Sequence, residues 1–177
     1  LLKPMLLSVL LFFLSLSTSA ATLTVTSSNA SGSGTLSNAI NTAQSGDTIV
    51  FDAALQGSTI LMQSIIDIDK DLAILGPGSD LLNIRYTPTN TAPMFRLNAP
   101  AENFTFTGLN VLSCGIIINN TIANVTFNDV QVTNAAYPVL RMNAFDVIAR
   151  LTNCRFADHN GSTVIQGSGS KIIMDNV

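Results

Sequence analysis

Four segments of this chain repeat one pattern of apolar residues. Each has apolar residues at its first, third, sixth and eighth positions, with a small or turn-forming pair at positions four and five; the last segment stops at position six. Successive segments start 21, 24 and 23 residues apart. Short β-patterned runs at such a period indicate a solenoid, in which each repeat stacks on the previous one. The segments are Phe104–Val111, Val125–Val132, Ala149–Phe156 and Ile172–Val177.

A second family of short apolar runs precedes these segments. Two strands joined by a two-residue turn, plus one further strand per repeat, predict an all-β fold, a parallel β-helix with three faces. Propeller blades need about forty residues each, and antiparallel sandwiches need hairpin turn pairs that are nearly absent here. The preceding runs are Phe95–Leu97, Ile116–Ile118, Val139–Met142 and Val164–Ile165.

Stacking predicts that equivalent residues form columns along the solenoid. Neighbouring strands lie about 4.8 Å apart, so each inward residue covers the one below. The second turn position holds Gly, Asp or Asn, which tolerate a positive φ best. The predicted inward columns are Phe104, Val125, Ala149 and Ile172; Phe106, Phe127, Leu151 and Met174; and Leu109, Val130, Cys154 and Val177. The predicted turn column is Gly108, Asp129, Asn153 and Asn176.

Residues 1–20 have the pattern of a secretion signal peptide. Lys3 gives a positive start, Met5–Leu16 is apolar, and small residues follow at 17–21. The apolar stretch is shorter than the roughly 20 residues that span a bilayer. We therefore expect residues 21–177 to lie outside the cytoplasm, secreted or at the cell surface; the alternative is a retained membrane anchor.

Between the signal and the repeats, the sequence predicts a cap and further coils. Residues 35–44 place Leu36, Ala39, Ile40 and Ala43 at helical spacing, with Ser33 or Thr35 as the N-cap. So short a helix needs a surface to cover, and the open end of a solenoid provides one. We expect the cap at about 22–46, coils at about 47–177 with a loop at 87–93, and continuation of the solenoid past residue 177. Strands are predicted at 22–26, 47–52, 59–62, 65–69, 72–75 and 81–84.

Composition excludes several classes of protein. Charged residues make up 11% of the chain and apolar residues 47%, which is unlike a disordered segment. The formal net charge of −3 provides no basic stripe for a nucleic acid, so we expect no nucleic-acid partner.

Two segments near the N-terminus resemble a known group of proteins. They are Ser31–Ile40, with its Gly-Thr-Leu-Ser-Asn-Ala-Ile run, and Ser45–Asp52, with Gly-Asp-Thr-Ile-Val-Phe; Asp69–Gly78 adds a first-coil pattern. The pattern is similar to the start of secreted bacterial right-handed parallel β-helix surface proteins, including CSLREA-type, polymorphic outer-membrane-protein and autotransporter-passenger types. Ser37 and Asn38 stand where Arg and Gln or Glu are usual, and Gly34 where the name-giving Cys would be. The resemblance implies a right-handed β-helix and export, with adhesins, anchored surface proteins and polysaccharide-acting enzymes among the members.

Three aspartates, Asp67, Asp69 and Asp71, are two residues apart in a strand-like segment. Alternation along a strand places Asp67 and Asp69 together on the outer face, where carboxylates could begin a Ca²⁺ site. Calcium is the one cofactor that the sequence suggests. The alternative is a solvated strand face, since a further coil would have to supply additional oxygen ligands.

The only histidine, His159, follows Asp158. The pair is superficially similar to the Asp-His pair on the β-helix of pectate lyases. However, no acidic residues align with it on adjacent coils, and hydrolysis would need two or three converging carboxylates. Asp158 and His159 are therefore candidate binding residues, with an ordinary loop as the alternative.

Arg96 and Arg141 lie two repeats apart in the preceding family of strands, facing outward if their apolar neighbours face inward. Because arginine binds carboxylates in a bidentate manner, acidic sugars are candidate ligands. The alternative is that both arginines simply keep the exposed face soluble.

These observations predict a structural or adhesive role, with carbohydrate or a cell surface as the partner and a membrane involved only through export or a downstream anchor. The runner-up is a polysaccharide lyase or glycoside hydrolase whose active site lies in further coils, and a third alternative is an autotransporter passenger.

Cys154 is expected to be a small core residue too far from Cys114 for a disulfide.

Overall fold

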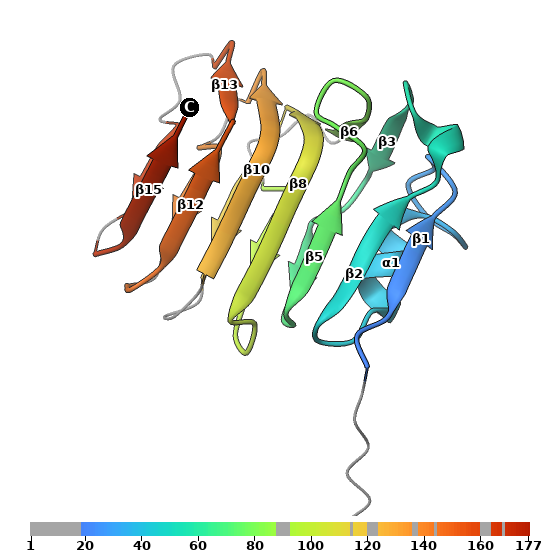
Figure 1. Ribbon diagram of the computed structural model, residues 1–177, viewed down its shortest axis with the longest axis horizontal. Coiled ribbons are helices and arrows are strands. Elements are labelled where there is room, and N and C mark those ends of the chain that lie inside the picture. Colours follow the sequence, from blue (N-terminus) through green and yellow to red (C-terminus); the bar gives the residue numbers. More distant parts are fainter. Residues whose placement is uncertain are drawn as a thin grey trace, which may run out of the picture.

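The computed structural model describes residues 19–87, 93–113, 115–119, 124–135, 138–143, 145–159, 164–167 and 169–177. Parallel strands stack into a β-solenoid of about six turns, with an α-helix near the N-terminus (Figure 1). The predicted fold class is therefore confirmed. The predicted signal peptide, apart from its last two residues, lies outside the described residues.

The larger sheet forms two of the three faces. Its first face runs through β1 (Thr22–Val25), β2 (Asp47–Phe51), β5 (Leu72–Leu75), the first half of β8 (Asn103–Leu112), the first half of β10 (Asn124–Thr133), β12 (Ile148–Thr152) and β15 (Lys171–Asp175). Its second face contains β3 (Thr59–Met62), β6 (Asn83–Tyr86), the second halves of β8 and β10, and β13 (Arg155–Ala157).

The two faces meet at a bend inside the long strands. The first half of β8 pairs with β5, and its second half pairs with β6. At the bend, φ is positive at Gly108 (64°), Asp129 (51°), Asn153 (52°) and Asn176 (52°). The predicted turn column is thus confirmed, because only residues that adopt this conformation readily can turn the strand here.

A separate sheet forms the third face. It contains β4 (Ile66–Ile68), β7 (Phe95–Leu97), β9 (Ile116–Ile118), β11 (Leu140–Met142) and β14 (Ile165–Gly167), all paired in parallel.

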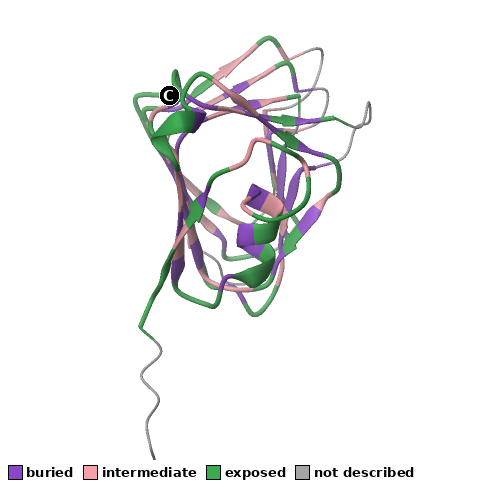
Figure 2. Ribbon diagram, turned by 90° about the vertical axis from the view of Figure 1, so that its right-hand side faces the viewer, coloured by how far each residue is buried: buried purple, intermediate pink, exposed green. Residues whose placement is uncertain are grey.

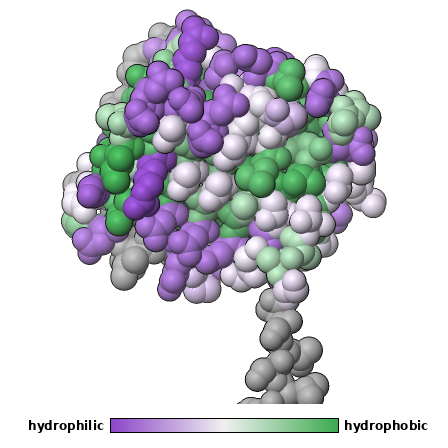
Figure 3. Space-filling view, viewed as in Figure 1, coloured by the Kyte–Doolittle hydropathy of each residue, from purple (hydrophilic) through white to green (hydrophobic). Residues whose placement is uncertain are grey.

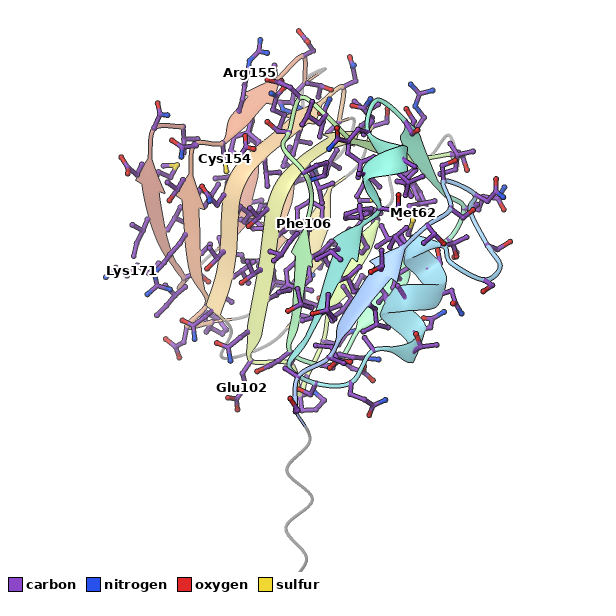
Figure 4. All side chains as sticks on the ribbon, turned by 45° about the vertical axis from the view of Figure 1, so that its right-hand side comes forward. Met62, Glu102, Phe106, Cys154, Arg155 and Lys171 are labelled. Carbon is purple, nitrogen blue, oxygen red and sulfur yellow. The ribbon has the colours of Figure 1, made fainter. Side chains whose placement is uncertain are left out.

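Strand pairing confirms the first two predicted inward columns. Phe104 pairs with Val125, which pairs with Ala149 and then Ile172. The Phe106 column aligns in the same way and is almost fully buried, except that Met174 in the last strand is 58% exposed. In the third column Leu109 pairs with Val130, and Cys154 is buried immediately before β13. The aromatic rings of the second column contact one another, which fills the interior (Phe106 is labelled in Figure 4).

The helix α1 (Leu36–Thr42) lies at the N-terminal end of the solenoid, as Figure 2 shows in a view along the axis on which the coils stack. Thr35 is the N-cap: its side chain accepts a hydrogen bond from the backbone of Asn38. Leu36 and Ile40 are buried against the first coil. Lys70 Nζ donates to the carbonyl oxygens of Ile40 (3.3 Å) and Ala43 (3.0 Å), so a lysine from the second coil holds the end of the helix.

Some details differ from the prediction. Val177, predicted as the last inward residue of the third column, is 53% exposed. A 3₁₀ turn, η1 (Ala53–Leu55), follows β2. The strand expected at 81–84 is β6, which starts two residues later at Asn83, because Leu81 still belongs to the preceding turn and donates its N–H to Gly78.

The loop after β5 crosses the bend of β8 at very close range. Gly76 N donates to Thr107 O at 2.7 Å, and Gly78 N donates to Gly108 O at 3.0 Å. A Cβ atom on Gly108 would lie 2.7 Å from the carbonyl oxygen of Gly76. Gly108 is therefore required for space as well as for its positive φ.

Candidate functional site

The outer side of the third face brings together three of the residues singled out in the sequence. Asp67 pairs with Arg96, Arg96 with Ile117, and Ile117 with Arg141, so these residues form one outward column. Arg96 and Arg141 are two coils apart, as expected, which corresponds to roughly 9.6 Å along the solenoid. Ile117 between them is only 8% exposed.

Arg96 and Asp67 form an ion pair, with Nη2 2.6 Å from Oδ2 and both side chains about half exposed. The hydrogen bond from Arg96, assisted by one from Asn98, outweighs partial burial and lowers the pKa of Asp67. Arg96 Nε is buried and has no hydrogen-bond partner. Because Nε has no contact with solvent, an acceptor from outside can reach only the exposed part of the Arg96 side chain.

An asparagine ladder runs beside this column. Asn143 Nδ2 donates to Asn119 Oδ1 (3.1 Å), Asn119 donates to Asn98 (3.0 Å), and Asn98 donates to Asp67 Oδ1 (2.8 Å). All three bonds point the same way and end on a carboxylate. Each side-chain amide has a second N–H, which these bonds do not use. Ladder and arginines together make a strip rich in hydrogen-bond donors, which we call the donor strip: Arg96, Asn98, Asn119, Arg141 and Asn143.

The sequence prediction missed the ladder, although a signal was present. Each of the three asparagines directly follows the last residue of a third-face strand, at Leu97, Ile118 and Met142. An asparagine repeated at the same point of successive coils is readable once the coils are aligned.

The other two aspartates of the suggested calcium site have different surroundings. Asp71 accepts hydrogen bonds from the backbone N–H groups of Glu102 (2.7 Å) and Asn103 (3.0 Å) and from Asn103 Nδ2 (2.9 Å). Partial burial raises its pKa, but these bonds together prevail and the pKa is lowered. Asp69 is exposed just after β4.

Within the described ranges, no group of three or more His, Cys, Asp or Glu side chains is placed to hold a metal ion. Asp67 and Asp71 already accept hydrogen bonds from neighbouring side chains or backbone. The calcium site therefore stays a prediction from the sequence.

Asp158 and His159 lie apart from the donor strip, after β13 at the end of the second face. Asp158 has a positive φ of 58° and is exposed. Both ring nitrogens of His159 are buried and have no hydrogen-bond partner. Asp158 and His159 thus follow a second-face strand, whereas Arg96 and Arg141 lie within third-face strands.

A cavity inside the solenoid is too small to hold a ligand. This cavity measures about 10 Å³ and is lined by apolar residues that include Val111, Phe127 and Leu140, a volume that barely holds one water molecule. Cys154 is a free, buried thiol whose pKa is raised mainly by burial; Cys114 lies outside the described residues.

Comparisons with known proteins add no relative: no family model matches the sequence, and neither a curated protein nor a solved structure matches it significantly. In the part of the chain that is described, none of the helices has the length and apolar character needed to cross a membrane.

Proposed function

We propose that this protein is an exported β-solenoid of the cell surface, with a structural and adhesive role, which binds acidic carbohydrate through the donor strip. The observation that carries the proposal is the placement of Arg96 and Arg141 in one outward column, two coils apart. Guanidinium groups bind carboxylates bidentately, and repeated carboxylates are what a polyuronate chain offers along its length.

The surroundings of the two arginines support this ligand class. The asparagine ladder has its carbonyl oxygens occupied at Asn98 and Asn119. The strip therefore presents donors rather than acceptors to a ligand, which matches carboxylate oxygens. The stacked core beneath it fixes the backbone spacing of the two arginines, so the backbone needs no ordering on binding.

The proposals that the protein is exported and that it belongs to a known family are both based on the N-terminal sequence. The signal-like segment at 1–20 supports a secreted or surface location. The similarity of Ser31–Ile40 and Ser45–Asp52 to secreted bacterial β-helix surface proteins supports assignment to that group. In such proteins a stiff solenoid holds binding faces away from the cell.

Binding to oligomers of polygalacturonate tests the proposal, with fully methyl-esterified oligomers as the uncharged control ligand. We expect the purified protein to bind the acid form and not the ester. Exchange of both arginines, Arg96→Gln with Arg141→Gln, should abolish the binding. Arg155→Gln, an exposed arginine on the second face (Figure 4), should leave it unchanged. Binding should also weaken with added salt.

Equal binding of acid and ester forms, or equal loss of binding in the Arg155→Gln variant, would contradict the proposal. Formation of unsaturated uronide products, followed by ultraviolet absorbance with and without Ca²⁺, would instead identify a lyase.

A further inference from the structure

The outer side of the first face carries two parallel ranks of uncharged side chains, most of them threonine, which we call the threonine face. Strand pairing aligns them over five strands, β1, β2, β5, β8 and β10. Six of these ten positions are threonine and none is charged. The first rank is Thr22, Thr48, Ala73, Thr105 and Thr126; the second is Thr24, Val50, Leu75, Thr107 and Asn128.

The backbone sets these side chains on a regular grid. Ranks from alternate residues of a strand are about 6.6 Å apart, and neighbouring strands are about 4.8 Å apart. Directly beneath the grid, Ile49, Ile74 and Phe106 are completely buried, so the strands rest on a packed core. Threonine is branched at Cβ and has few side-chain rotamers. The hydroxyl and methyl groups are therefore held in place before anything binds.

The chemistry of this face differs from that of the other two. The second face presents Arg85 and Arg155, and the third presents Arg96 and Arg141. Across the threonine face the first charged residue in either rank is Arg150, on the sixth strand. Figure 3 views this face, with side chains of intermediate and apolar hydropathy across its middle. A charge-free grid without aromatic rings suits neither a polyanion nor the face of a sugar ring.

We propose that the threonine face binds ice. An uncharged lattice of water molecules complements an uncharged protein surface. Threonine hydroxyls donate and accept hydrogen bonds with water, while the methyl groups between them restrict the orientation of first-shell water. Regular spacing extends this ordering along the first rank, where four of the five residues are threonine, and the ordered layer joins the growing ice crystal. This inference is independent of the donor strip, since the two surfaces lie on different faces.

Thermal hysteresis and the shape of single ice crystals in solutions of the purified protein test this inference. We expect hysteresis and faceted crystals for the unchanged protein. Thr126→Lys and, separately, Thr105→Lys should remove most of the hysteresis, because a long charged side chain breaks the grid. Thr133→Lys is the matched control: it lies on the same strand as Thr126 and is similarly half-buried, but it faces outward from the second face. It should retain the hysteresis.

Circular dichroism establishes that each variant is folded, and Thr105→Lys gives the comparison if Thr126→Lys does not fold. Absence of hysteresis and of ice shaping in the unchanged protein would overturn the inference. So would an equal loss in the Thr133→Lys control. Retention on microcrystalline chitin or cellulose without any effect on ice would also overturn it, in favour of a solid polysaccharide as the partner.

Discussion

The hydroxyl of Ser79 donates a hydrogen bond to Asp129 Oδ1 at 2.6 Å, and the backbone N–H of Ser79 donates to Oδ2 at 3.1 Å, across 50 residues of sequence. Ser79 belongs to the loop after β5, whereas Asp129 is in the bend of β10, so the contact passes over the intervening strand β8. Gln131 Nε2 reinforces it with bonds to Ser79 Oγ (3.2 Å) and Asp80 Oδ1 (2.8 Å). Three successive coils are thereby tied together on their outer side.

Asp129→Asn should destabilise the protein by about 1–3 kcal/mol, because it removes a charge-assisted acceptor and sets an amide N–H against the donors of Ser79. Asparagine tolerates the positive φ at this position, so the backbone is not the cause. Urea unfolding followed by circular dichroism measures the loss. The matched control is Asp158→Asn, which also has a positive φ but is exposed, and it should change stability by less than about 0.5 kcal/mol. Equal losses would contradict the role of the Ser79 contact.

Gly108→Asn should cost more than about 1 kcal/mol, even though asparagine accepts a positive φ. The added Cβ would lie 2.7 Å from Gly76 O, which is backbone and cannot rotate away. Gly57→Asn is the control, since Gly57 also has a positive φ (78°) but has open space around it. Thermal unfolding of both variants separates crowding from conformation. A similar shift in the midpoint for both would show that crowding is not the cause.

Stability should fall in acid through Asp47. This buried carboxylate accepts hydrogen bonds from the backbone N–H groups of Gln44 and Ala21, both at 2.7 Å, and these bonds lower its pKa below the ordinary 3.8. A group with a lowered pKa in the folded state stabilises the fold above its unfolded pKa, and this contribution is lost as the pH falls through the folded pKa. Asp47→Asn should therefore destabilise the protein at neutral pH, with a difference that shrinks below about pH 4. Urea unfolding over this range measures it, and a difference independent of pH would refute the assignment.

Arg96→Gln should change the free energy of unfolding by less than about 1 kcal/mol, because its ion pair with Asp67 is about half exposed. The pKa of Asp67 should rise toward its ordinary value, since the hydrogen bond from Arg96 is the largest cause of its lowering. Carboxyl ¹³C chemical shifts recorded against pH measure this change, with Arg155→Gln as the control. A large loss of stability would mean that Arg96 holds the fold, and any lost binding could then not be assigned to the donor strip.

The repeat in the sequence was sufficient to predict the interior of the solenoid. Phe106, Phe127 and Leu151 align because every coil must bury an equivalent residue, and alignment of the segments finds them. The same holds for the bend, since only residues tolerant of positive φ are compatible with it.

Contacts on the outer side could not be predicted in this way. The Ser79–Asp129 contact depends on how far a loop reaches across a neighbouring coil, which no local pattern specifies. Lys70 is another case: in the sequence it stands among three aspartates, yet its side chain donates hydrogen bonds to carbonyl oxygens at the end of α1. Of the candidate site, the column of Arg96 and Arg141 was predictable from the repeat, as was the asparagine that follows each of three third-face strands. The ion pair with Asp67 and the hydrogen bonds of the ladder depend on side-chain orientation, which the repeat does not specify.

In the column of Arg96, Ile117 and Arg141, the number of coils sets the distance between the two arginines. Gain or loss of one whole coil between the two arginines changes their separation by one strand spacing, about 4.8 Å, while the packing of each coil is kept. A partial coil would move inward residues outward and destroy the core. The spacing of the two arginines, on which the proposed binding of acidic carbohydrate depends, therefore changes only in discrete steps set by the thickness of a single peptide strand.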